Sequence, residues 1–111
     1  MKRKFVIIKS GNNYNKIFIS DILHCTAEGS YTEIKTNEKL YSERKILKEY
    51  EAKFVDNGFM RISSSYLVNM YYAIEINIGR SPFLTLENGE KLQISTRRLA
   101  KVIRAFRENQ G

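Results

Sequence analysis

Apolar and polar residues alternate at period two through most of the chain, and this pattern restricts the fold more than any other feature. Such alternation is typical of strands with one buried face, because successive side chains of a strand point to opposite sides. Nine short runs rich in β-branched and aromatic residues predict strands, at 5–9, 16–20, 22–27, 31–36, 59–62, 66–70, 73–78, 83–87 and 90–94. We therefore expect a mainly β protein of many short strands.

Glycine and asparagine occupy the breaks between many of these runs, and the pair Asn88-Gly89 is the clearest hairpin signal among them. Both residue types adopt positive φ angles at low cost, which a tight type I′ turn requires. A two-residue loop of this kind would pair Glu87 with Glu90 and Leu86 with Lys91. The frequency of such turns predicts short connections and antiparallel pairing.

Two segments change from strand to helical spacing. The first predicts a short amphipathic helix over about 43–54, with Ser42 as its N-cap, an acidic residue in its first turn and an apolar face made by Ile46, Leu47, Tyr50 and Phe54. The second predicts a C-terminal helix over about 96–108, with an apolar face made by Leu99, Val102, Ile103 and Phe106. A chain of 111 residues without a visible linker is expected to form a single domain over 1–111.

Positive charge dominates the chain and gathers toward its ends. Nineteen Lys and Arg residues against 12 Asp and Glu residues give a formal net charge of +7. The predicted C-terminal helix has a basic outer face, made by Arg97, Arg98, Lys101, Arg104 and Arg107. This distribution favours an anionic partner such as a nucleic acid. A basic face that is only solvated remains the simpler reading of the charge by itself.

The residues do not support catalysis or a bound metal. Cys25 and His24 are adjacent on a predicted strand, so their side chains point to opposite faces and cannot form a nucleophile–base pair. We expect Cys25 to be a small buried hydrophobe and His24 a partly buried or surface strand residue. One cysteine and one histidine cannot supply the usual zinc ligands, and the glycines form no phosphate-binding fingerprint. We expect no enzyme activity, no cofactor and no metal site.

The single cysteine fits a reducing compartment, and the apolar run after the basic N-terminus is too short for a signal peptide or a membrane span. A cytoplasmic protein is therefore expected. The apolar residues of the C-terminal helix are explained as its core-facing side, which argues against membrane insertion.

Two segments carry groups suited to phosphate binding. The start of the C-terminal helix has hydroxyl residues followed by Arg97 and Arg98, which places two cations at the positive end of a helix dipole and favours an external anion there. The run Ser63, Ser64 and Ser65 separates two predicted strands. That run is either a plain turn or a set of hydroxyls that contact phosphate oxygens.

Four phrases of the chain resemble, in order and spacing, the LytTR DNA-binding domain of bacterial LytR/AlgR-type transcription regulators. They are IFISDIL at 17–23, EGSYTEI at 28–34, FMRISSSYLVN at 59–69 and LENGEKLQISTRR at 86–98. The resemblance covers about residues 16–106. It implies about ten short strands in small antiparallel sheets, with loops that enter successive major grooves of DNA.

Carried over by matching position, the resemblance implies a role for eight residues. The expected base-reading residues are Ser30, Tyr31, Ser64 and Arg97, and the expected phosphate-binding residues are Arg61, Ser65, Ser95 and Arg98. Asn69 matches a position with a structural role. This chain has Ser63 where the family often has histidine, and only Arg97 among the base-reading residues can bind guanine with two parallel hydrogen bonds.

Two functions follow as alternatives. The first is a sequence-specific regulator of transcription that binds double-stranded DNA, either as a stand-alone protein or as the C-terminal piece of a larger one. The second is a basic interaction module that binds RNA, an acidic protein or an anionic surface. For the first function, the partners left open are a second copy on an adjacent DNA repeat and a separate receiver or sensor protein.

Overall fold

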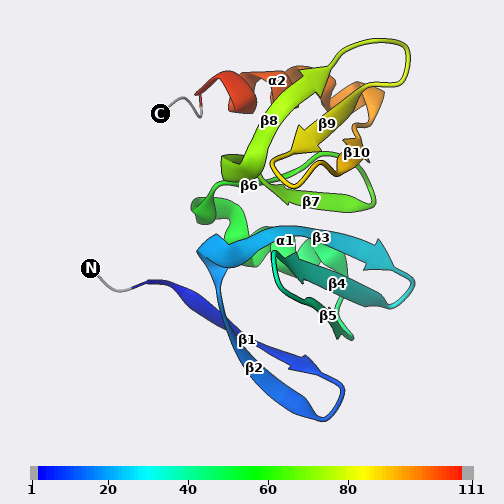
Figure 1. The fold of residues 1–111 in the computed structure, drawn as a ribbon. Coiled ribbons are helices and arrows are strands. Elements are labelled where there is room, and N and C mark those ends of the chain that lie inside the picture. The colour runs from blue at the N-terminus through cyan, green and yellow to red at the C-terminus, as the bar shows by residue number, and fades with distance from the viewer. Residues whose placement is uncertain (1–2, 109–111) are drawn as a thin grey trace.

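The computed structural model describes residues 3–108 and confirms a mainly β fold (Figure 1). In the described part, ten strands and two α-helices are joined by short loops and 3₁₀ turns. The strands are β1 (Phe5–Ser10), β2 (Asn13–Phe18), β3 (Ile22–Glu28), β4 (Tyr31–Thr36), β5 (Leu40–Glu43), β6 (Phe59–Arg61), β7 (Tyr66–Asn69), β8 (Ala73–Asn77), β9 (Phe83–Leu86) and β10 (Lys91–Gln93). The helices are α1 (Leu47–Phe54) and α2 (Leu99–Glu108), and the 3₁₀ turn η4 (Thr96–Arg98) leads into α2.

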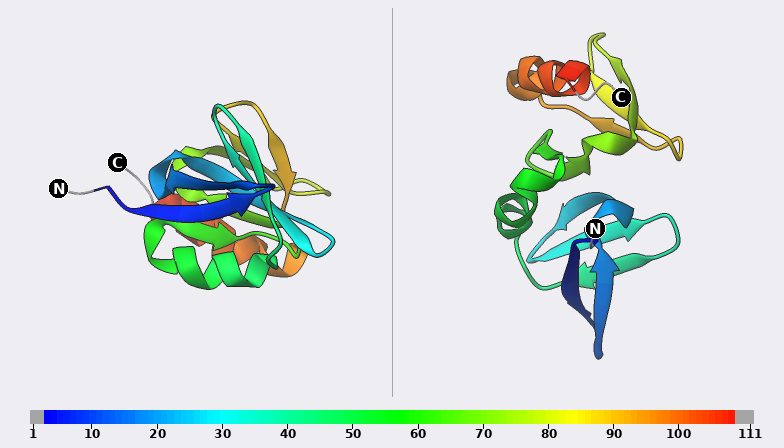
Figure 2. Two further views of the ribbon diagram at one scale, coloured as in Figure 1. Left: turned by 90° about the horizontal axis from the view of Figure 1, so that it is seen from below. Right: turned by 90° about the vertical axis from the view of Figure 1, so that its left-hand side faces the viewer.

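The strands form three antiparallel sheets. A central five-stranded sheet has the order β5-β4-β3-β7-β6, a three-stranded sheet has the order β10-β9-β8, and β1 pairs with β2 alone. The three-stranded sheet and α2 lie on one side of the central sheet, whereas the β1–β2 hairpin lies on the other (Figures 1 and 2). Each sheet is small, so hydrophobic packing between the sheets must supply much of the stability.

Two hydrophobic cores lie on opposite faces of the central sheet, as period-two alternation requires. Cys25 and Leu67 face the core that α1 and the β1–β2 hairpin cover. Leu23 and Val68 face the core that the three-stranded sheet and Val102 of α2 cover. Cys25 is fully buried, and burial raises the pKa of its thiol well above the ordinary value, which confirms a packing role for this residue.

The first helix begins later than the sequence pattern predicts. Ser42 belongs to β5, which pairs with β4, and α1 starts only at Leu47 with Ile46 as its N-cap. Glu43 is directed into the core instead of capping a helix, because its carboxylate accepts the Lys9 backbone N–H at 3.0 Å and the Tyr50 hydroxyl. The prediction of a helix from residue 43 was wrong because these long-range partners favour the extended backbone.

The hairpin between β9 and β10 has three loop residues instead of two. Thr85 pairs with Lys91, and the Leu86 N–H donates to the Glu90 carbonyl at 2.9 Å. Gly89 has a φ of +92°, whereas no residue other than glycine has a positive φ in the described part of the chain. The expected type I′ loop needs a positive φ at Asn88 as well, so the chain forms a three-residue loop closed by the glycine.

The C-terminal helix is confirmed with a tighter first turn than expected. Residues 96–98 form the 3₁₀ turn η4, and the Arg98 N–H donates to the Ser95 carbonyl at 3.0 Å. The α-helical part runs from Leu99 to Glu108, and Val102 is its fully buried residue. The remaining apolar residues of its inner face are partly buried against the second core, which leaves Lys101, Arg104 and Arg107 exposed.

Candidate nucleic-acid interface

Several loops from distant parts of the sequence meet at one edge of the molecule, on the right in Figure 1. The segments are the β3–β4 turn at Gly29, the serine loop at 63–65, the β8–β9 loop at 79–82 and the η4 turn. The Ala27 N–H donates to the Ser65 carbonyl at 2.9 Å, which joins the end of β3 to the serine loop. A shallow groove of about 380 Å³ is lined by the serine loop, the β8–β9 loop and residues 93–96. We call this side of the molecule the loop edge.

The serine loop is held in shape by Arg61. The guanidinium donates to the Ser63 carbonyl and to the Ser64 carbonyl, each at 2.8 Å, and forms an ion pair with Glu51 at 2.9 Å. Ser63 Oγ in turn accepts the backbone N–H groups of Ser65 and Tyr66. Three of the five guanidinium N–H groups are therefore bound inside the protein, which leaves two for an external acceptor. The Ser64 and Ser65 side chains remain exposed.

The segment that leads into α2 lies beside the serine loop. The Ser95 N–H donates to the Ile62 carbonyl at 2.9 Å, which fixes the end of β10 against the strand that precedes the serines. Ser95 Oγ is a buried side-chain polar atom without a hydrogen-bond partner among the described residues. It therefore does not cap the helix as a serine at this position could, and its hydrogen-bonding capacity is unused within the described residues.

The two arginines of η4 differ in exposure but share a lack of acidic partners. Arg97 is exposed and Arg98 is half-buried. Within residues 3–108, neither guanidinium makes an ion pair with a carboxylate or a side-chain hydrogen bond. Two cations next to each other, uncompensated and beside a hydroxyl-lined groove, favour an anionic ligand.

The β3–β4 turn presents Ser30 and Tyr31 at the same edge. Gly29 has a φ of +61°, a conformation that glycine adopts without strain, and it lets Glu28 pair directly with Tyr31 across the hairpin. Ser30 is exposed, and 44% of the Tyr31 surface is accessible. An exposed aromatic ring beside a hydroxyl offers both apolar contact and hydrogen bonding to a base edge.

The sequence-predicted site residues are thus brought to one edge, and Asn69 is separate from them. Asn69 is buried, donates to the Ile22 carbonyl at 3.0 Å and accepts the Tyr71 N–H at 3.1 Å, so it joins two strand ends. The sequence analysis missed Arg80 and Ser81, which line the same groove from the β8–β9 loop. The break Gly-Arg-Ser-Pro at 79–82 marks a loop in the sequence, but only the fold places that loop beside the serines.

A buried polar network connects the central sheet to the β9–β10 hairpin. His24 Nε2 lies 3.2 Å from a Glu90 carboxylate oxygen, and Lys35 Nζ also lies 3.2 Å from that carboxylate. The Thr26 hydroxyl lies 3.2 Å from His24 Nδ1. A neutral imidazole with its proton on Nε2 satisfies both contacts, since it donates to Glu90 and accepts from Thr26. His24 is 5% exposed, which is more buried than the sequence analysis expects.

The environment shifts the pKa of both partners downward. Burial lowers the pKa of His24 below its ordinary value, and the Glu90 carboxylate opposes this only in part. Partial burial acts to raise the pKa of the Glu90 carboxyl, but the hydrogen bond from Asn88 and the contacts with His24 and Lys35 outweigh it and lower the pKa. His24 is therefore neutral and Glu90 charged near pH 7.

We expect acid to destabilise the fold in two stages. The unfolded chain takes up a proton on His24 below about pH 6.5, whereas the folded chain does so only at lower pH. The free energy of unfolding should therefore fall as pH drops from about 6.5, by at most about 1.4 kcal/mol per pH unit for this one group. A second loss should follow as pH falls through the lowered pKa of Glu90. Urea unfolding at stepped pH values measures both stages.

The variant His24→Gln is the matched control for the first stage, because glutamine can donate to Glu90 but does not titrate. We expect this variant to lose the dependence of stability on pH between about 6.5 and 5 while keeping the loss at lower pH. A wild-type unfolding free energy that stays constant from pH 7 to pH 5 would contradict the assignment of a neutral, buried imidazole.

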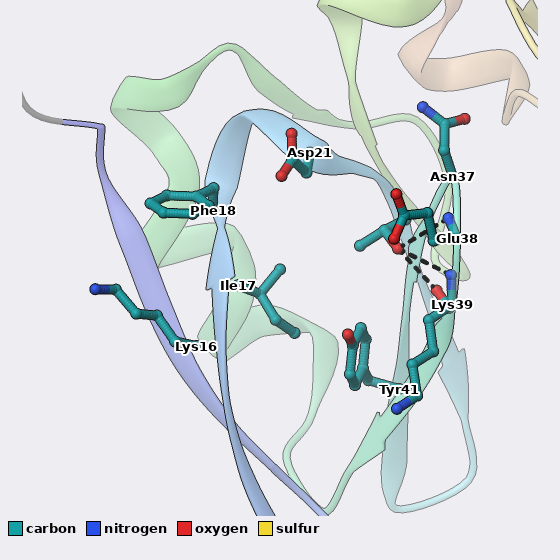
Figure 3. A pocket seen from close by; sticks show the side chains of 9 residues that line it. Lys16, Ile17, Phe18, Asp21, Asn37, Glu38, Lys39 and Tyr41 are labelled. Carbon is teal, nitrogen blue, oxygen red and sulfur yellow. Dashed lines mark hydrogen bonds between the residues drawn. The ribbon is translucent and has the colours of Figure 1, made fainter.

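A second hollow, of about 380 Å³, lies between β2 and the β4–β5 turn and does not share the character of the loop edge (Figure 3). Its charged lining residues are two cations, Lys16 and Lys39, and two anions, Asp21 and Glu38. The Thr36 hydroxyl is bonded to the backbone of the turn itself. Balanced charge and internal hydrogen bonds give this hollow no preference for an anion.

Residues 3–108 contain neither a membrane-spanning helix nor a cluster of metal-binding side chains. Neither of the described helices has the length and hydropathy needed to cross a membrane. In the same part, His, Cys, Asp and Glu side chains do not gather in groups of three or more that could hold a metal ion. The groups best placed to bind a ligand are therefore those of the loop edge: exposed hydroxyls, an aromatic ring and the guanidinium groups of Arg97 and Arg98.

The family model of the LytTr DNA-binding domain matches residues 12–107, which includes every loop of the loop edge. The chain belongs to the LytTr DNA-binding domain family. The match begins inside the β1–β2 hairpin and ends in α2. The resemblance that the four sequence phrases carry is thereby confirmed.

A solved structure and two curated proteins are similar to this LytTr domain. The structure is the LytTr DNA-binding domain of a methyl-accepting/DNA response regulator from Bacillus cereus, with a TM-score of 0.81, 20% sequence identity, and coverage of 95% of this chain and 97% of that one. This likeness confirms the fold of ten short strands in small antiparallel sheets.

The curated proteins are the heme-containing CO-sensing transcriptional regulators RcoM 2 and RcoM 1 from Paraburkholderia xenovorans (strain LB400). Each is 26% identical to this chain, over 83 and 81 residues, which are 74% and 72% of the chain. The chain spans only about a third of the length of these relatives, 31% and 30%. The similarity therefore concerns one part of each regulator.

Proposed function

We propose that this LytTr domain binds a specific double-stranded DNA sequence, as the DNA-binding part of a transcription regulator, and reads successive major grooves through its loops. The observation that carries the proposal is the loop edge, where separate loops present exposed hydroxyls, an aromatic ring and the guanidinium groups of Arg97 and Arg98, which have no acidic partner among residues 3–108. The longest dimension of the domain is 42 Å. It exceeds the repeat of about 34–36 Å between successive turns of a groove, so the domain is large enough for contacts with both.

We assign base reading to four exposed residues of the loop edge. Arg97 has the planar fork that binds guanine O6 and N7 with two hydrogen bonds. Ser64 in the serine loop, and Ser30 or Tyr31 in the β3–β4 turn, offer hydroxyl or apolar contact to a base. All four side chains belong to exposed residues.

We assign phosphate contacts to the remaining four residues of the loop edge that the family resemblance indicates. Ser65 supplies an exposed hydroxyl, Ser95 supplies a hydroxyl without a partner among the described residues, and Arg98, whose N–H donates to the Ser95 carbonyl, supplies a half-buried cationic side chain. Arg61 has a side chain that is 16% exposed, so it can donate its two remaining N–H groups to a phosphate while it holds the serine loop. Phosphate contacts fix the position of the protein on the duplex, and base contacts select the sequence.

The role as a regulator also implies partners. A second copy on an adjacent DNA repeat would lengthen the recognised sequence, and a receiver or sensor unit would connect binding to a signal. The two RcoM relatives are transcriptional regulators by name, which supports a regulatory role for the domain. The competing proposal is a basic module that binds RNA, an acidic protein or an anionic surface through the same charges.

The salt dependence of duplex binding tests the proposal. If the domain neutralises about five phosphates, the slope of log K against log salt concentration should be about −4.5. Fluorescence anisotropy with a duplex selected from random sequences measures K at several salt concentrations, and a scrambled duplex, a duplex RNA and acidic vesicles serve as comparisons. A flat salt response, or equal affinity for all four ligands, would favour the basic interaction module.

A further inference from the structure

We propose that a second basic surface, made by Arg44, Lys45 and Lys9, binds the DNA phosphate backbone on the side of the β3–β4 turn that faces away from the serine loop. This inference rests on the proposed function, since it extends the same contact with DNA by a patch that neither the family phrases nor the charge analysis indicates. We call it the β5–α1 basic patch. It would add sequence-independent affinity and lengthen the footprint of the domain.

The patch borders a groove of about 460 Å³ between the β1–β2 hairpin and the β5–α1 loop. Tyr31, already assigned to the loop edge, lines this groove together with the three cations and with residues 10, 11, 42 and 43. The groove is therefore continuous with the β3–β4 turn. In Figure 1 the β1–β2 turn and the end of β5 lie on the same side of the molecule as that turn.

The backbone of the β5–α1 loop, which carries Arg44 and Lys45, is held by hydrogen bonds on two sides. The Thr32 hydroxyl donates to the Lys45 carbonyl at 2.7 Å, and the Lys45 N–H donates to the Glu43 carbonyl at 2.9 Å. On the other side, the Ser42 N–H donates to Ser10 Oγ at 3.1 Å. Arg44 lies between these anchors and is exposed. A loop held in this way loses little conformational entropy when a ligand binds.

The charges of the patch are largely free to meet an anion. Arg44 makes no side-chain hydrogen bond or ion pair within residues 3–108. The one carboxylate that lines the groove, Glu43, is 8% exposed and accepts the Lys9 N–H and the Tyr50 hydroxyl. Lys45 Nζ lies 3.9 Å from it, at the outer limit of an ion pair. The Lys9 ammonium lies 5.8 Å from the centre of the Tyr14 ring and stays at the surface.

DNA is the anion that this arrangement fits best. The hollow in Figure 3 has equal numbers of cations and anions, whereas here three cations face one buried carboxylate. The cations border a groove that is also lined by the exposed Tyr31. A rigid polyanion that crosses the loop edge at Tyr31 would therefore also pass these cations. Separate positive charges along an open groove suit the successive phosphates of a DNA backbone better than a single bound phosphate. Contacts with the backbone carry no sequence information.

The test compares the double variant Arg44→Ala/Lys45→Ala with the control Lys39→Ala/Lys53→Ala. The control removes the same charge from two exposed lysines, one in the β4–β5 turn at the far end of β4 and one near the C-terminal end of α1. Anisotropy with the selected and the scrambled duplex, over several salt concentrations, measures affinity and slope. Circular dichroism and thermal unfolding verify that each variant folds.

We expect the patch variant to weaken both duplexes by about tenfold at 0.1 M salt and to reduce the magnitude of the salt slope by about 1.8, which corresponds to two phosphates. The ratio of specific to non-specific affinity should stay the same. The control should change the slope by much less, and the charge reversal Arg44→Glu/Lys45→Glu should weaken both duplexes further. In the patch variants alone, the stretch of DNA protected from hydroxyl radicals should be shorter, and the protection should be lost at one end.

Two results overturn the proposal while leaving the proposed function intact. One is a patch variant whose slope and affinity equal those of the control while the wild type binds duplex DNA with a steep slope. The other is that inorganic phosphate or a mononucleotide binds at the patch at low concentration, while the patch variants bind duplex DNA as the wild type does. A wild type that does not bind duplex DNA would instead contradict the proposed function itself.

Discussion

The variant Arg97→Ala is expected to weaken binding of the selected duplex by about 1–3 kcal/mol, or roughly 5- to 150-fold, and to leave binding of a scrambled duplex almost unchanged. The reason is that an exposed guanidinium with no internal partner among the described residues can form two hydrogen bonds to a guanine edge. A methyl side chain leaves that edge without donors. Competition binding with duplexes that vary one base pair at a time identifies the position at which the preference relaxes.

Arg98→Ala is the matched control for Arg97→Ala, because the two residues are adjacent, carry the same charge and lie in the same 3₁₀ turn. Arg98 is half-buried and is assigned to a phosphate, so its loss should weaken all duplexes alike and reduce the salt slope by about 0.9. If the two variants have the same effect on sequence preference, the assignment of roles within η4 is wrong.

The strand pattern could be predicted from the sequence because the buried and exposed faces follow local alternation. Cys25 and Leu67 on one face and Leu23 and Val68 on the other show this directly, since the sheet separates two cores. The two helices were predicted as well, although both begin with a segment that is not α-helical. Local spacing is informative wherever one side of an element faces a core.

The errors arose where a distant partner decides the conformation. Ser42 and Glu43 resemble the start of a helix, but β4 needs a neighbour on its outer side and Glu43 finds its partners on β1 and α1. The contact of His24 with Glu90 joins residues 66 positions apart, and no local pattern indicates it. Periodicity describes a residue and its near neighbours, so partners at this separation stay hidden until the sheets are assembled.

The site was predictable to a different degree in each of its parts. The charge at Arg97 and Arg98 and the serine run are visible in the sequence, and their meeting at one groove is not. Arg61 illustrates the limit. The family resemblance implies a phosphate contact for it, whereas the structure also shows its guanidinium donating to two carbonyls of the serine loop. Arg44 was hidden by the incorrect helix boundary, which placed it in the first turn of the predicted helix.

The variant Phe54→Ala is expected to lower the free energy of unfolding by about 3–5 kcal/mol, a large part of the total of about 5–15 kcal/mol that is usual for a domain. Phe54 is fully buried at the end of α1, with its ring centre 4.8 Å from that of Phe59 and 5.8 Å from that of Tyr50. Its loss leaves a cavity between the helix and the central sheet. Urea unfolding followed by circular dichroism measures the change.

Phe5→Ala provides the control for this prediction, since it removes the same side chain from the outer face of β1, where Phe5 is 49% exposed. We expect that variant to cost less than about 1 kcal/mol, because about half of the residue already contacts water. Equal losses in the two variants would show that α1 is not packed as described.

The loss of the Phe54 ring should also disturb the DNA-binding surface, because its neighbour Phe59 begins the short strand that ends at Arg61 and leads into the serine loop. A Phe54→Ala protein that is still folded should therefore bind the selected duplex less tightly, and Phe5→Ala should bind it as the wild type does.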